Sequence, residues 1–207
     1  MDEAQARRQI IDAARSIFTR SLTHGSTGNI SVRVDDRIIV TPTGSSLGTV
    51  TADDLSVISL DGAHLTGAKP SKEAFLHAAM LRARPTAAAV IHTHSTYSAA
   101  VSCLADVDPE NVLPPLTAYF AMRIGRLPLL PYHAPGDDSL GPLAERAARD
   151  SAALLLSNHG PIVANATVAG ALDALEELEE TARLHLMLQG MRVRPLTPEQ
   201  VSALRPR

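Results

Sequence analysis

The sequence predicts a single-domain, layered α/β/α sandwich with a mixed, largely antiparallel central sheet. Three observations support this fold class. The 207 residues are enough for one large domain and short for two, so one domain is expected over residues 1–207. Short β-branched runs alternate irregularly with segments of helical periodicity, which is typical of layered α/β domains. Some neighbouring runs are joined by turns of two residues, which connect antiparallel strands.

The expected strands are short apolar runs bounded by turn residues. Asp35 and Asp36 join the first two runs as a hairpin, and Asp61 with Gly62 is expected to turn the chain after the third. Aromatic residues make up only 3% of the chain and Trp is absent, so Ala, Leu, Val and Ile must build the core. The expected strands are 30–34, 37–41, 55–60, 87–94, 127–130, 152–157 and 161–164.

The expected helices have apolar residues on one face and recognisable ends. Ser71 is expected to cap the second helix, and Pro85 follows the end of that helix. The longest helix ends at Gly190. Thr197, followed by Pro198 and by Gln at the third helical position, predicts a capped final helix. The expected helices are 6–22, 72–84, a stretch reaching 105, 140–149, 169–189 and a short segment from 197.

Composition and charge exclude several functional classes. A formal net charge of −3, with scattered basic residues and few aromatic ones, gives no basic surface for nucleic acid. No apolar run reaches the roughly 18 residues that a membrane span needs, and the first residues lack the pattern of a secretion signal. Cys103, the single cysteine, cannot form an internal disulfide and is expected to be a small packed residue. We therefore expect a cytoplasmic protein with no nucleic-acid or membrane partner.

Two histidines stand one residue apart at the end of an expected buried strand, in the stretch VIHTHSTY (90–97). Alternate residues of a strand project from the same face, so His92 and His94 can converge on one ion. Packed or hydrogen-bonded histidines near a strand end are the alternative. His159 ends a second strand of the buried type, and three imidazoles with an open position suit a catalytic zinc ion. The remaining histidines are expected to be solvated or capping residues: His24, His64, His77, His133 and His185.

Glu73 lies in the first turn of an expected helix, shortly after Ser71. A carboxylate at this place can simply interact with the helix dipole, or it can be the proton-transfer group of an open zinc site. The N-terminus of a helix is also an anion site. Ser71 and the turns at 25–29 and 43–46 are rich in hydroxyl groups and resemble phosphate cradles, although each alone could be an ordinary turn.

Five motifs follow one another along the chain: GSTGNIS (25–31), TPTG (41–44), PSKE (70–73), HTH (92–94) and NHG (158–160). Together and in this order they resemble those of the class II aldolase/adducin family. The resemblance runs from the first helix to Gly190 and implies the fold of that family. The family's His-x-His pair and its later histidine bind zinc, so the resemblance implies one ion held by His92, His94 and His159. Glu73 matches the family's acid/base and could be a fourth ligand in the resting enzyme.

The family's phosphate contacts fall on small residues of these turns. Sugar-phosphate aldolases often carry a second serine directly after the one that matches Ser71. This chain has Lys72 there, which offers an additional cation near an anionic substrate. The matching phosphate contacts are Asn29, Thr43, Gly44 and Ser71, with Gly28 shaping its loop.

The segments 108–119, 123–132 and 135–137 are similar to the branch of the family that decarboxylates 3-oxo-tetronate 4-phosphates. This similarity implies zinc-dependent decarboxylation of such a substrate to dihydroxyacetone phosphate and CO2, through a metal-stabilised enediolate, in four-carbon sugar acid catabolism. The alternative on the same site is a sugar-phosphate aldolase of the L-fuculose-phosphate type or a pentulose-phosphate 4-epimerase. The alternative from another class is a non-catalytic, adducin-like interaction module.

Three further side chains in these segments have two candidate roles each. Tyr119 could donate a proton, but a packed aromatic residue is expected. Arg123 and Arg126 could bind the substrate carboxylate by bidentate pairing, or they could be solvated. Relatives in the family place their active sites at subunit interfaces, so the resemblance also implies a homo-oligomer, namely a tetramer.

Overall fold

The centre of the molecule is an eight-stranded sheet with the strand order β4-β3-β2-β1-β5-β8-β7-β6. The computed structural model describes residues 1–204. Within them, β6 and β7 are parallel and the other neighbouring strands are antiparallel, which confirms the mixed, largely antiparallel sheet. The strands are β1 Asn29–Val34, β2 Arg37–Val40, β3 Ser56–Ser59, β4 His64–Thr66, β5 Ala89–His92, β6 Leu129–Leu130, β7 Ala153–Leu156 and β8 Gly160–Asn165.

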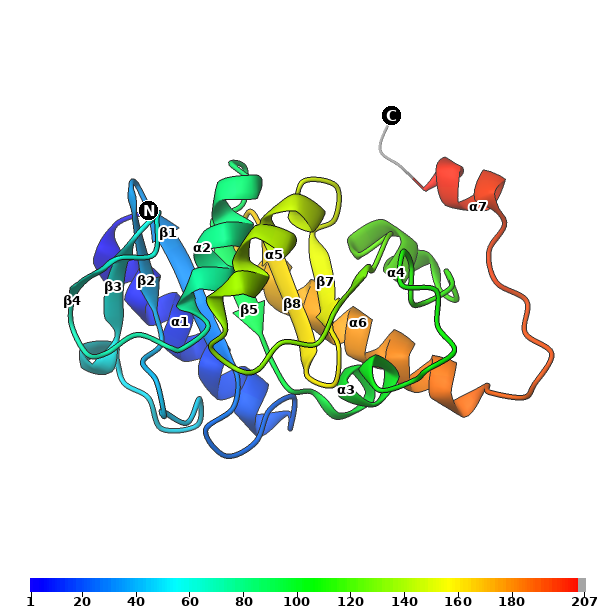
Figure 1. Cartoon of the computed structure of the whole chain (residues 1–207), viewed down its shortest axis with the longest axis horizontal. Coiled ribbons are helices and arrows are strands. Elements are labelled where there is room, and N and C mark those ends of the chain that lie inside the picture. Colours follow the sequence, from blue (N-terminus) through cyan, green and yellow to red (C-terminus); the bar gives the residue numbers. More distant parts are fainter. Residues whose placement is uncertain (205–207) are drawn as a thin grey trace.

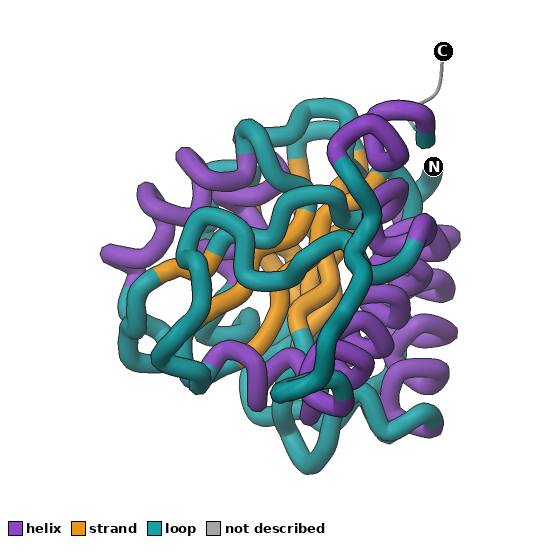
Figure 2. Tube along the Cα trace, turned by 90° about the vertical axis from the view of Figure 1, so that its right-hand side faces the viewer, coloured by secondary structure: helices purple, strands orange, loops and turns teal. Residues whose placement is uncertain are grey.

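Helices cover both faces of the sheet, and Figure 2 shows the strands enclosed between them. One face packs against α1 Glu3–Thr19, α3 Thr96–Ser102, α4 Ala118–Arg123 and α6 Val168–Met187. The other face packs against α2 Ala74–Ala83 and α5 Gly141–Ala148. Two short 3₁₀ helices are η1 Ala52–Asp54 and η2 Asp138–Leu140. The last helix, α7 Pro198–Ala203, lies beyond the body of the fold at the end of an extended segment (Figure 1).

The two layers of helices explain why β7, with the sequence ALLL, is apolar at every position. In β7, Ala153 and Leu155 pack in the core on the α1 and α6 side, whereas Leu154 and Leu156 pack on the α2 and α5 side. Successive side chains of a strand point to opposite faces, so a strand that is covered by helices on both faces is favoured to carry apolar residues at successive positions. Phe120 is the largest fully buried side chain, in a core otherwise built mainly from Ala, Leu, Val and Ile, as expected.

Several local expectations are wrong. Helix α2 begins at Ala74 with Glu73 in the N-cap position, so Ser71 is not the cap; its hydroxyl oxygen accepts a hydrogen bond from the Glu73 N–H at 3.3 Å. Cys103 is exposed rather than packed, because it follows the last residue of α3. Strand β4 and helix α4 were not expected. Helix α4 has a recognisable start, because the Thr117 hydroxyl accepts the Phe120 N–H.

Gly160 brings the turn between β7 and β8 against the end of β5. A Cβ atom at this position would lie 2.2 Å from the carbonyl oxygen of Thr93, which is much closer than van der Waals contact. Asn158, two residues before Gly160, has a positive φ of 54°, and Asn tolerates this conformation better than most residues. The absence of a side chain at Gly160 therefore lets His159 lie beside the two histidines that follow the apolar part of β5.

Among residues 1–204, no helix combines the length and the apolar character that crossing a membrane requires.

Candidate metal centre

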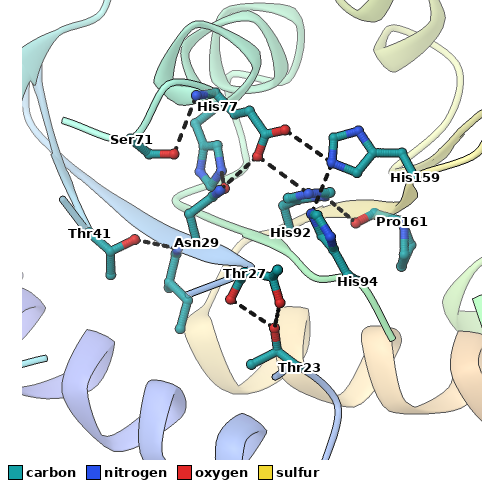
Figure 3. Close-up of polar contacts among 12 residues, drawn as sticks. Thr23, Thr27, Asn29, Thr41, Ser71, His77, His92, His94, His159 and Pro161 are labelled. Atoms are coloured by element: carbon teal, nitrogen blue, oxygen red, sulfur yellow. Dashed lines mark hydrogen bonds and ion pairs between the residues drawn. The ribbon is translucent and has the colours of Figure 1, made fainter. Parts of the chain in front are cut away.

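Three imidazoles and one carboxylate converge at one end of the sheet. His92 is the last residue of β5, His94 lies between β5 and α3, and His159 lies in the turn between β7 and β8. Figure 3 shows the three rings close to one another, and each pair meets edge to face. One ligand atom from each of these histidines and one from Glu73 all lie within 4.8 Å of one another. The structure therefore brings together the residues that the sequence assigned to a metal site. Because β5 ends at His92, the turn after it, and not strand alternation, positions His94.

The hydrogen bonding of His92 fixes which of its nitrogens can bind a ligand. Its Nδ1 lies 2.8 Å from the carbonyl oxygen of Pro161, and a carbonyl only accepts, so Nδ1 carries the proton. Nε2 is then an unprotonated lone pair, and it is buried without a hydrogen-bond partner. A buried polar atom without a partner is costly. A metal-binding histidine shows this same pattern, with one nitrogen donating to a carbonyl and the other on the ion.

The distances between the four ligand atoms also suit a metal ion. His94 Nε2 lies 2.9 Å from His159 Nε2, and the two carboxylate oxygens of Glu73 lie 3.1 Å from His159 Nε2 and 3.4 Å from His92 Nε2. Ligands at about 2.0–2.1 Å from a tetrahedral zinc ion are separated by roughly 3.3 Å. The donor set of three imidazoles and one carboxylate therefore fits a divalent ion.

Burial favours the neutral forms of His92 and His94. Burial, followed by the nearby His92 and His159, lowers the pKa of His94 to about 3. Burial also lowers the pKa of His92. For Glu73, burial is the largest single influence and raises the pKa, but His92 and the hydrogen bonds from His159 and Asn29 outweigh it and hold the pKa well below its usual range. Neutral imidazoles and an ionised carboxylate are the forms that bind a metal ion.

Helix α3 links the segments that carry His94 and His159. At its N-terminus, the buried carboxylate of Glu179 on α6 accepts the N–H groups of Tyr97 at 2.8 Å and of Ser98 at 2.9 Å. At its C-terminus, the hydroxyl oxygen of Ser102 accepts the His159 N–H at 3.2 Å. Both ends of this short helix are thus anchored to the elements around the site.

A pocket of about 250 Å³ opens directly onto this cluster. Its small volume suits a small metabolite rather than a polymer. Lys72 is the one lysine or arginine that lines it among the described residues. The structure brings every residue expected at the phosphate into this pocket. Its lining comprises Ser26, Thr27, Gly28, Asn29, Pro42, Thr43, Gly44, Ser71, Lys72, Glu73, His94, Pro135 and His159.

Backbone contacts bring the separate turns of the pocket together. The Thr43 N–H donates to the Lys69 carbonyl at 3.0 Å, and the Ser71 N–H donates to the Thr41 carbonyl at 3.2 Å. Gly28 has a positive φ of 81°, and a Cβ atom there would lie 3.1 Å from the His92 carbonyl oxygen. A glycine is therefore required at position 28, where the loop passes close to the end of β5.

One residue near the site was not expected there. His77 was expected to be solvated or capping, but it is fully buried on α2, one turn after Glu73. Its ring nitrogens contact the side chains of Ser31 and Asn29 on β1. The spacing of four residues from Glu73 on one helix was the available signal. His24 and His64 are exposed as expected, and His133 and His185 are partly buried.

The three side chains left with two candidate roles lie outside this pocket within the chain. Tyr119 is 59% exposed, so the expected packed aromatic is wrong. The Arg123 guanidinium lies over the Tyr119 ring and pairs with Asp173 at 3.3 Å. Arg126 pairs with Glu110. Both arginines are thus engaged at the surface of the chain.

The fold agrees with comparisons to known proteins. The chain belongs to the class II aldolase and adducin N-terminal domain family, whose model matches residues 8–186. It is 43% identical over 205 residues to the 3-oxo-tetronate 4-phosphate decarboxylase of Haemophilus influenzae, covering 99% of this chain and 98% of that protein.

Two further relatives show how widely this architecture is shared. The L-fuculose phosphate aldolase of Methanocaldococcus jannaschii is 36% identical over 182 residues, covering 87% of this chain and 96% of that protein. The crystal structure of YgbL from Klebsiella pneumoniae, described as an aldolase, epimerase or decarboxylase, superposes with a TM-score of 0.96 at 41% identity. It covers 99% of this chain and 100% of that one.

Removing one imidazole should abolish stoichiometric metal binding. Protein purified with a divalent metal salt is expected to hold about one ion per chain, and His92→Ala should lose it because only two of the three imidazoles that form the core of the donor set remain. Metal analysis after gel filtration measures this. His64→Ala, at an exposed histidine on β4, is the control and should keep the ion. Equal metal contents in wild type and His92→Ala would contradict the assignment.

Buried His77 should make the metal-free protein sensitive to mild acid. Burial, with His92 nearby, lowers the pKa of His77 from 6.5 to about 3, so between these values the unfolded chain binds a proton that the folded chain does not. The free energy of unfolding should therefore fall as the pH drops from about 6.5 toward 3, by on the order of 1–2 kcal/mol between pH 7 and pH 5 from this group. Urea unfolding in a chelator measures it. The dependence should be shallower in His77→Gln and unchanged in His64→Gln; identical slopes in all three proteins would refute the prediction.

Proposed function

We propose that the protein is a metal-dependent carbon–carbon lyase that decarboxylates a 3-oxo-tetronate 4-phosphate to dihydroxyacetone phosphate and CO2. The observation that carries the proposal is the largely buried cluster of three histidines and Glu73 at the end of a pocket lined by hydroxyl groups and Lys72. The higher identity to the decarboxylase, 43% against 36% for the aldolase, supports decarboxylation over aldol cleavage.

We further propose zinc as the ion, held by His92, His94 and His159, with Glu73 as a fourth ligand in the resting protein. A donor set rich in neutral imidazole suits zinc, although such sites also accept manganese, cobalt or iron. A divalent ion bound there supplies a Lewis acid, which stabilises the negative charge left on the substrate when the C1–C2 bond breaks.

Glu73 is the group that handles the proton of this reaction. When C1 leaves as CO2, the electron pair of the C1–C2 bond stays with C2, and C2 must then take up one proton. The pKa of Glu73 lies well below its usual range, so the resting group is a carboxylate that first accepts a proton from solvent and then gives it to C2. The Asn29 amide donates to Glu73 Oε2 at 2.9 Å and helps to hold the carboxylate in place.

The small residues around the pocket are proposed to hold the phosphate. Thr43, Gly44 and Ser71 lie on adjacent turns, and the Ser71 hydroxyl accepts the Glu73 N–H, which leaves its own proton free to donate. Gly28 and Asn29 complete this side of the pocket. Binding at the phosphate end fixes the orientation of the C1–C2 bond, which is how such contacts accelerate a reaction at the other end.

Lys72 adds positive charge to the same pocket. The substrate carries a carboxylate as well as a phosphate, whereas a sugar phosphate carries the phosphate alone. Lys72 directly precedes Glu73 and the N-terminus of α2, so the helix dipole and its ammonium group both favour an anion there. A lysine at this position therefore suits a sugar-acid phosphate.

We propose that the protein acts as a homo-oligomer. Tyr119, Met122 and Tyr132 are each more than half exposed in the isolated chain, and large exposed apolar side chains are common at subunit interfaces. Static light scattering is expected to give a mass several times that of one chain. A monomeric mass at micromolar concentration, in a protein that turns over substrate, would rule the oligomer out as a requirement.

The metal-loaded protein should release CO2 and dihydroxyacetone phosphate from a 3-oxo-tetronate 4-phosphate. A panel containing both C2 configurations of this substrate, L-fuculose 1-phosphate and a pentulose 5-phosphate measures the preference directly. The highest kcat/KM is expected with one configuration of the keto acid. Efficient cleavage of fuculose phosphate without release of CO2 from either keto acid would replace decarboxylation by the aldolase reaction.

Glu73→Gln should separate metal binding from proton transfer. The three histidines remain, so the variant should still hold the ion, but kcat should fall by about 10²–10⁴-fold because an amide cannot carry the proton. Metal analysis and steady-state kinetics on the same sample measure both effects. Glu180→Gln, at an exposed glutamate of α6, is the control. Full activity in Glu73→Gln would remove this residue from the mechanism.

A further inference from the structure

A chain of buried hydrogen bonds runs from β1 to Glu73 through a histidine that has no direct place at the metal site. The Ser31 hydroxyl lies 2.7 Å from His77 Nδ1, and His77 Nε2 lies 2.5 Å from Asn29 Oδ1. The Asn29 amide nitrogen lies 2.9 Å from Glu73 Oε2 (Figure 3). All four side chains are buried, so water does not compete for these contacts.

The chemistry of the groups fixes which group donates and which accepts in each of these hydrogen bonds. The carboxylate of Glu73 only accepts, so Asn29 must turn its NH₂ toward Glu73 and its carbonyl oxygen toward His77. His77 Nε2 must then carry a proton and donate it to Asn29. A neutral imidazole with its proton on Nε2 has a lone pair on Nδ1, which accepts the Ser31 hydroxyl. Burial, with His92 nearby, lowers the pKa of His77 to about 3, which is consistent with a neutral ring.

We propose that His77 is a positioning residue for Glu73, acting through Asn29. This inference rests on the role of Glu73 in the proposed function. The donor at His77 Nε2 prevents the Asn29 amide from turning over, because the turned amide would present its oxygen to the Glu73 carboxylate and its NH₂ to another donor. The locked amide holds Glu73 Oε2, while Oε1 is directed at His159.

The alternative is that His77 only ties α2 to β1. Ser31 and Asn29 lie on the face of β1 opposite the side chains of Ile30 and Val32, which pack toward α1 and α6. A histidine that bonds to both residues of β1 would therefore stabilise the packing of α2 on the sheet. This purely structural role makes no demand on which nitrogen carries the proton, and it predicts that changes at His77 and Asn29 act on activity independently.

The tautomer of His77 can be measured without any substrate. In ¹⁵N-histidine-labelled protein loaded with zinc, two-bond nitrogen–proton correlations distinguish a protonated Nε2 from a protonated Nδ1. His77→Gln identifies the signals of His77. Protonated Nε2 at pH 7 is expected. A proton on Nδ1 would reverse the chain of hydrogen bonds and overturn the proposal, whatever reaction the protein catalyses.

Kinetics then distinguish positioning from packing. His77→Leu removes the donor and is expected to lower kcat by ~10²-fold, as misplacement of a catalytic group does, with KM changed by less than about threefold and the metal retained. His77→Gln places an amide N–H near the position of Nε2 and should recover most of the rate. His185→Leu, at a partly buried histidine of α6, is the control and should have wild-type kcat.

A double-mutant cycle with Asn29→Ala completes the test. Because His77 is proposed to act through Asn29, His77→Leu should cost little further kcat once Asn29 is already alanine. Independent losses that multiply in the double variant, or a loss of kcat that follows the loss of bound metal, would overturn the proposal. If the wild type releases no CO2 from the keto acids, the proposed function fails, and the same cycle is run on fuculose phosphate cleavage.

Discussion

The site depends on one electrostatic constraint: three imidazole nitrogens and a carboxylate are held close together in a largely buried place. His92 Nδ1 carries the only ring proton and donates it in a hydrogen bond to the Pro161 carbonyl. His92 Nε2 therefore faces Glu73 Oε2 at 3.4 Å with no hydrogen between them. Lone pairs at such distances repel one another unless a cation lies among them. The fold supplies the compensating rigidity, because Gly160 admits the turn that carries His159 and α3 is anchored at both ends.

Glu73 links the metal cluster to the pocket, because it belongs to both. Glu73 occupies the N-cap position of α2, so the start of one helix presents Glu73, Ser71 and Lys72 within three residues. Backbone hydrogen bonds hold the turn at 41–44 beside this segment. A ligand with an anionic end and a carbonyl end can therefore contact both parts at once.

The sequence was informative where a residue type has few other uses. Two strands of the buried type that each lead into histidine predicted His92, His94 and His159, and the sandwich followed from apolar strands among amphipathic helices. The sequence was uninformative where tertiary contacts determine whether a side chain is buried and what it contacts. His77 looks like any helical histidine until β1 supplies Ser31 and Asn29, and Cys103 follows an apolar run yet emerges at the end of α3. Ser71 has the residue type of a cap, but the backbone turns into the helix two residues later.

The ligands of the cluster come from three separate stretches of the chain, the start of α2, the end of β5 and the turn before β8. No short fragment of the polypeptide contains the full donor set. During synthesis on the ribosome, the nascent chain can thus bind an ion through all four residues only after the second half of the sheet has emerged and paired. An ion that binds only the folded chain stabilises the native state by its binding free energy. Removal of the metal would therefore lower the free energy of unfolding.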